Sequence, residues 1–96
     1  MTALLGHNFI NGGRSAHGSV SLQSLDATTG EALPLSFMEA TRDEVDAAAV
    51  AAGNAYPAYR LTSAAQRALF LDAIADELDA LGDEFIAMVC RETALP

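Results

Sequence analysis

The sequence predicts an α+β fold, with antiparallel strands in about residues 8–38 and helices in about residues 42–56, 63–81 and 83–93. Two observations carry this prediction. Five of the seven glycines precede residue 40, where short apolar runs alternate with turn residues. The remainder of the chain is rich in alanine and leucine at helical spacing. The 96 residues are enough for one small domain.

The first part of the chain, residues 1–40, has the pattern of short strands joined by tight turns. Asn11-Gly12 in FINGGRS predicts a type I′ hairpin turn, because both residues tolerate positive φ. Apolar residues alternate with serines in GSVSLQSL, as in a half-buried strand. DATTGE predicts a second turn around Gly30. Pro34 places the following run, ALPLSFM, at a sheet edge or a strand end.

The second part, residues 41–96, is predicted to be helical. Thr41 and Glu44 have the spacing of a capping box, which satisfies free N–H groups of a first helical turn. Pro57 is expected to end this first helix near residue 55 or 56, because proline cannot donate the next helical hydrogen bond. One face of the helix is small and suited to close packing: Val45, Ala48, Ala49 and Ala52.

A second capping box, Ser63 and Gln66, precedes a long apolar stripe with spacings of three and four residues. Gly82 is expected to kink this helix or divide it into two. The stripe favours the core of a globular fold over a coiled coil, because it spans fewer than three heptads. The first helix is too small to cover it, so the stripe requires a further partner surface. Its residues are Leu71, Ile74, Leu78, Leu81, Phe85 and Met88.

Charge and composition exclude several classes of function. The net charge is −8, and all five basic residues are arginines. Binding to nucleic acid or to an anionic membrane surface needs clustered positive charge, which the chain lacks. A single cysteine cannot form an internal disulfide. No apolar run is long enough for a membrane helix, and the start lacks a basic signal-peptide region, so a cytoplasmic location is expected.

No catalytic, cofactor-binding or metal-binding residue is predicted in this chain. Cys90 falls near a helix C-terminus, where the dipole disfavours a thiolate, and is interpreted as a buried or half-buried filler. His7 and His17 lack further ligands at zinc spacing and are interpreted as surface residues. Four carboxylates recur at helical spacing and are interpreted as a solvated face rather than a cation site: Asp72, Asp76, Asp79 and Asp83.

The order of several short motifs resembles the N-terminal segment of the NAD(P)-dependent aldehyde dehydrogenase superfamily. These motifs are FINGG, DATTGEAL and the run from ATRDEVDAAAVAAGNAYPAYR to RETALP. Asp26-Ala27 departs from the family's usual Asn-Pro, and ETALP departs from its usual Gly-Lys ending. The second departure, together with TGEALPLSFMEAT, resembles the branch of 2-oxoglutarate semialdehyde (2,5-dioxopentanoate) and NADP-linked long-chain aldehyde dehydrogenases.

The resemblance implies that residues 1–96 are the N-terminal part of the dinucleotide-binding domain of an α/β aldehyde dehydrogenase, with Pro96 as a truncation point. The parent would oxidise an aldehyde, 2-oxoglutarate semialdehyde above all, with NADP somewhat favoured over NAD. Its catalytic cysteine and cofactor site would lie beyond this chain, which alone would be inactive. The rest of the parent, expected to be a homo-oligomer, would pack on the stripe. The alternative is a stand-alone, small acidic helical module that binds a partner protein through the same stripe.

Overall fold

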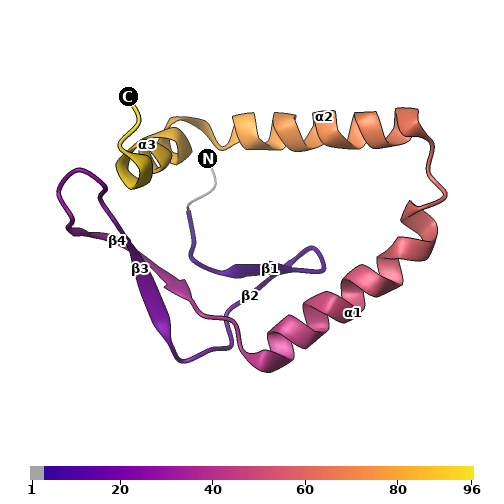
Figure 1. The fold of residues 1–96 in the computed structure, drawn as a ribbon, viewed down its shortest axis with the longest axis horizontal. Helices are drawn as coiled ribbons and strands as arrows, with labels where there is room; N and C mark the ends of the chain where they lie inside the picture. Colours follow the sequence, from indigo (N-terminus) through magenta and orange to yellow (C-terminus); the bar gives the residue numbers. More distant parts are fainter. Residues whose placement is uncertain (1–3) are drawn as a thin grey trace.

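The computed structural model describes residues 4–96 and confirms the α+β class (Figure 1). Two small antiparallel sheets precede three helices. The strands are β1 (Asn8–Ile10), β2 (Gly13–Ser15), β3 (Ser21–Leu25) and β4 (Ala32–Met38). The helices are α1 (Arg42–Tyr59), α2 (Ala64–Ala80) and α3 (Gly82–Thr93).

The first hairpin has the turn that the sequence predicts. Strands β1 and β2 pair with Ile10 opposite Gly13, which leaves a two-residue turn. Asn11 and Gly12 have φ values of 50° and 76°. Positive φ at both positions is the signature of the type I′ turn, whose twist matches that of the flanking strands. The Asn-Gly pair is therefore the local cause of the hairpin.

The second hairpin joins β3 and β4 through the DATTGE turn. Leu22 pairs with Phe37, and the register shifts between Gln23 and Leu25. The side-chain amide of Gln23 donates to the carbonyl of Leu33 at 3.0 Å, inside the hairpin. Pro34 lies within β4, and in a two-stranded sheet each strand has a free edge that tolerates a missing donor.

The helix boundaries follow the capping signals closely. The side chains of Thr41 and Ser63 accept from the backbone N–H groups of Glu44 and Gln66, and both reciprocal bonds are present. Gly82 has a φ of 75°, which ends α2 and starts α3 in a new direction. The division predicted at this glycine is confirmed.

The predicted end of the first helix before Pro57 is wrong. Helix α1 continues through Pro57 to Tyr59, and the N–H of Arg60 still donates to the carbonyl of Tyr56 at 2.9 Å. Pro57 cannot donate to the carbonyl of Gly53, and its ring crowds that carbonyl. Gly53 and Pro57 are both exposed, so solvent can hydrogen-bond to this carbonyl in place of the missing donor.

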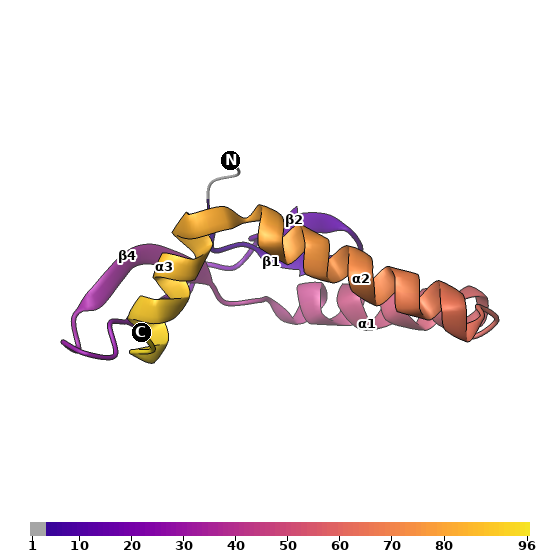
Figure 2. The same cartoon turned by 90° about the horizontal axis from the view of Figure 1, so that it is seen from above.

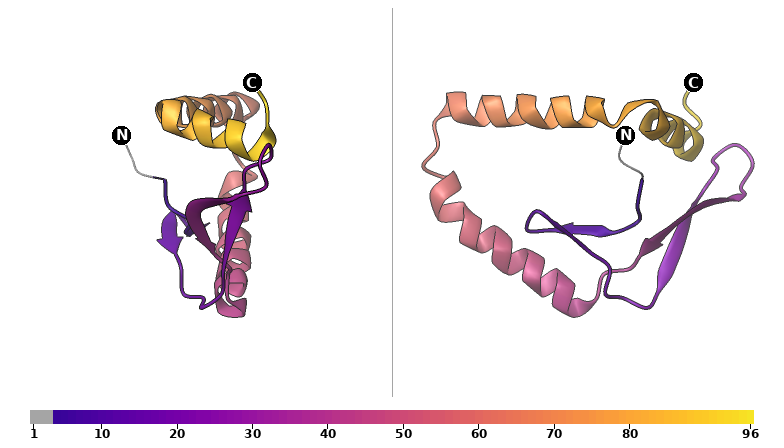
Figure 3. Two further views of the ribbon diagram at one scale, coloured as in Figure 1. Left: turned by 90° about the vertical axis from the view of Figure 1, so that its left-hand side faces the viewer. Right: turned by 180° about the vertical axis from the view of Figure 1, so that it is seen from behind.

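The molecule is an open, flat ring rather than a packed globule. Helices α1 and α2 form two sides that meet at residues 60–63, and α3 lies beside the β3–β4 turn (Figure 1). The views from above and from the side show a single thin layer (Figures 2 and 3), with extents of 47 × 32 × 21 Å. The radius of gyration is 16.5 Å. A compact chain of this length would have about 12–13 Å.

The hydrophobic core is correspondingly small. Leu33 is the single fully buried apolar residue among residues 4–96. The accessible surface is 7275 Å². A compact protein of this mass exposes about 5,200 Å², so about 2,000 Å² of extra surface is open. Most of the apolar side chains of α1 and α2 therefore have no cover within this part of the chain.

Candidate functional site

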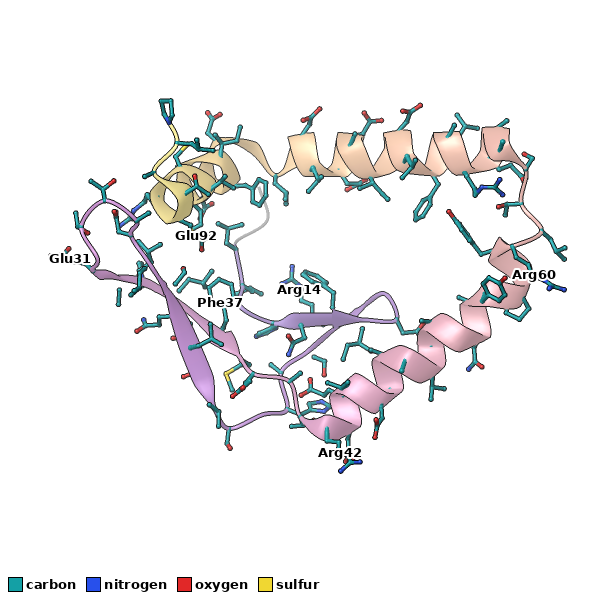
Figure 4. All side chains as sticks on the ribbon, in the orientation of Figure 1. Arg14, Glu31, Phe37, Arg42, Arg60 and Glu92 are labelled. Atoms are coloured by element: carbon teal, nitrogen blue, oxygen red, sulfur yellow. The ribbon has the colours of Figure 1, made fainter. Side chains whose placement is uncertain are left out.

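The candidate site is the open apolar surface that α1 and α2 turn toward the interior of the ring, termed here the inner surface. It comprises Val45, Ala48, Ala49, Ala52, Tyr56 and Tyr59 of α1 with Phe70, Leu71, Ile74 and Leu78 of α2. Each set falls on one helical face by its spacing. On α2, Leu71 is 64% exposed, Leu78 is 50% exposed and Ile74 is 41% exposed. Figure 4 shows side chains from both helices reaching toward the ring interior.

The opposite face of α2 is acidic. Asp72, Asp76 and Asp79 are all exposed, as the sequence predicts for a solvated face. Leu69 also lies on this outer side, about half a turn of the helix away from Ile74 and Leu71. Helix α2 thus carries three aspartates on one side, while its other side is mainly apolar but also includes Arg67 and Glu77.

The predicted stripe is divided at Gly82 into an open part and a covered part. Leu81, Phe85 and Met88 are half-buried, whereas Leu71, Ile74 and Leu78 are exposed. The three half-buried residues line an apolar cleft of about 280 Å³ against β4 and the N-terminal segment. Other residues along this cleft include Phe9, Arg14, Leu35, Phe37, Val89 and Glu92. Figure 4 places Arg14, Phe37 and Glu92 around the same region of the ring.

The corner between α1 and α2 is fixed by two contacts. The rings of Tyr59 and Phe70 meet edge-to-face with centroids 6.1 Å apart, a geometry that aromatic pairs prefer. Arg67 donates from Nη1 to the carbonyl of Thr62 at 2.5 Å, across the loop between the helices. These contacts close one end of the inner surface and set the angle between its two sides.

Glu44 ties the first hairpin to α1. Its carboxylate accepts from the hydroxyl of Ser15 in β2 and from the backbone N–H of Thr41, and the residue is only 4% exposed. The hydrogen bond from Ser15, followed by that from the Thr41 backbone, lowers the pKa of Glu44 from 4.5 to about 2. A carboxylate held by several donors stays ionised. The capping residue predicted from the sequence therefore also holds β2, a contact that the sequence did not predict.

Asp26 ties the second hairpin to α3. Its Oδ1 accepts the N–H groups of Thr28 and Thr29 at 2.9 and 3.1 Å, which shapes the turn. Its Oδ2 lies 3.7 Å from Nε of Arg91, and the Arg91 carbonyl accepts the N–H of Ala27 at 2.9 Å. The hydrogen bond from Thr28, then that from Thr29, and the Arg91 charge lower the pKa of Asp26. The sequence alone does not reveal this pair, because its members are far apart along the chain.

The remaining residues considered for chemistry are not brought together. Cys90 is half-buried on α3, as expected for a filler, and its Sγ lies 4.0 Å from the carbonyl of Pro96. His7 and His17 are both exposed. Within residues 4–96, no three histidine, cysteine or acidic side chains cluster as metal ligands. None of the helices in this same range is long and apolar enough to cross a membrane.

The family of the chain comes from comparison with known proteins. The model of a family described as "Aldehyde dehydrogenase family" matches residues 15–96. An alpha-ketoglutaric semialdehyde dehydrogenase of Acinetobacter baylyi is 42% identical over 91 residues, covering 95% of this chain and 17% of that protein. Alpha-ketoglutaric semialdehyde dehydrogenase 2 of Azospirillum brasilense is 38% identical over 94 residues, covering 97% of this chain and 18% of the relative.

A third relative is named for a different substrate. Succinate-semialdehyde dehydrogenase (NADP(+)) 1 of Mycobacterium tuberculosis is 42% identical over 71 residues, covering 74% of this chain and 15% of the relative. The chain thus spans less than a fifth of the length of the curated relatives it matches. No solved structure matches it.

Proposed function

The chain belongs to the aldehyde dehydrogenase family, and from this premise we propose that it is part of a longer enzyme that oxidises an aldehyde to a carboxylate with NAD(P)+. The proposed substrate is 2-oxoglutarate semialdehyde. The two relatives that align over nearly the whole chain carry that activity in their names, and this agreement is the observation that supports the substrate. Succinate semialdehyde is the second candidate, because a further relative is named for it.

The proposed reaction follows the chemistry that the family resemblance implies. A cysteine thiolate adds to the aldehyde carbon, and the resulting thiohemiacetal transfers hydride to NAD(P)+. Water then hydrolyses the thioester and releases the carboxylate, with two protons formed in the whole reaction. Both the nucleophile and the dinucleotide site are proposed to lie outside these 96 residues. Cys90 is assigned no catalytic role, because it lies in the last turns of α3, where the helix dipole does not stabilise a thiolate.

NADP is proposed as the preferred cofactor and the cytoplasm as the location. One relative carries NADP(+) in its name, which supports the cofactor. The single cysteine, which cannot form an internal disulfide, supports a reducing compartment. We assign cofactor binding to the remainder of the protein.

The role proposed for this segment is structural: the remainder of the same chain packs on the inner surface and on the cleft beside α3. The support is the amount of open apolar surface. Exposed apolar patches of this size on a protein usually mark an interface. No finding favours the alternative of a stand-alone acidic module, and the family match favours a part of an enzyme.

The test is an activity assay on the full-length protein that contains this chain. The purified enzyme is offered 2-oxoglutarate semialdehyde, succinate semialdehyde and an uncharged aldehyde of similar length, each with NAD+ or NADP+, and reduced cofactor is followed by absorbance. The expected result is the highest kcat/KM for 2-oxoglutarate semialdehyde with NADP+. Cys90→Ala is expected to leave kcat unchanged. An enzyme that oxidises none of the aldehydes, or one inactivated by Cys90→Ala, contradicts the proposal.

A further inference from the structure

We draw no further inference here: the strongest candidate, the apolar cleft of about 280 Å³ between β4 and α3 that is lined by Phe37, Phe85 and Met88, is an unpartnered apolar surface, and nothing in the structure shows what covers it.

Discussion

Arg91 and Asp26 hold the last helix against the second hairpin through two different groups. The guanidinium Nε of Arg91 lies 3.7 Å from the Asp26 carboxylate, while the Arg91 carbonyl accepts the N–H of Ala27. The family motif that DATTGEAL resembles usually has asparagine at the position of Asp26. Asparagine can accept the turn's N–H groups equally well, but only aspartate adds the ion pair.

Replacing Asp26 separates its two roles. Asp26→Asn keeps an oxygen for the N–H groups of Thr28 and Thr29 and loses only the ion pair, which contributes little because the Arg91 side chain is 53% exposed. Asp26→Ala removes both, so the turn opens more often. We expect amide exchange at Thr28 and Thr29 in the full-length protein to rise several-fold in Asp26→Ala and to change little in Asp26→Asn. Equal exchange in the two variants would show that the side chain does not shape the turn.

The lowered pKa of Glu44 predicts how the stability of the protein depends on pH. Its pKa is lowered on folding from 4.5 to about 2. A lowered carboxyl pKa gives stability that is fully present above pH 4.5 and is lost as the pH falls toward 2. Glu44→Gln lacks this titration. The difference in unfolding free energy between the full-length protein and this variant should be constant near neutral pH and shrink with acidification through that window.

The control for Glu44 is Asp46, a carboxylate at an exposed position on the same helix. Asp46→Asn is expected to change the unfolding free energy at neutral pH by less than about 0.5 kcal/mol. Thr41→Ala removes the other half of the capping box and should cost about 1 kcal/mol at neutral pH. If Glu44→Gln and Asp46→Asn give the same profile by urea titration, Glu44 does not tie the hairpin to α1.

Gly82 and Gly53 should respond in opposite directions to the same substitution. Gly82 has a φ of 75°, where an alanine costs about 1–2 kcal/mol. Gly53 lies inside α1, and a Cβ added there meets nothing within 4 Å. Gly53→Ala should therefore stabilise by about 0.5–1 kcal/mol. Thermal unfolding of both variants checks this, and a Gly82→Ala protein as stable as the parent would mean that α2 and α3 can form one continuous helix.

The parts of the fold that can be predicted from the sequence are those that depend on residues close together in the chain. The Asn11-Gly12 turn, the capping boxes at Thr41 and Ser63 and the break at Gly82 each depend on a few neighbouring residues. Pro57 shows where a local rule fails. The sequence does not show whether the carbonyl four residues earlier, on Gly53, is open to solvent, and in the structure Gly53 is exposed and the helix continues through Pro57.

The candidate site could be predicted only in part. The apolar spacing identified the face of α2 that lacks cover, from Leu71 to Leu78. It did not show that Gly82 turns the second half of the stripe onto β4, where Phe85 and Met88 are half-buried. The Ser15–Glu44 contact was also missed, because β2 and α1 become neighbours only after the hairpin and the loop between them take their paths.

Leu71 and Leu69 offer a matched test of the inner surface. They are the same residue type on the same helix, 64% and 69% exposed, and they point to opposite sides of α2. In the full-length protein, Leu71 is expected to be covered, so Leu71→Asp would lose about 1.5–3 kcal/mol of apolar burial and add the cost of a buried charge. Leu69→Asp, on the acidic outer face, should cost less than about 0.5 kcal/mol. Urea unfolding of the two variants measures the difference. Equal effects would mean that the remainder of the protein covers both faces or neither, and the inner surface would then not be a specific docking site.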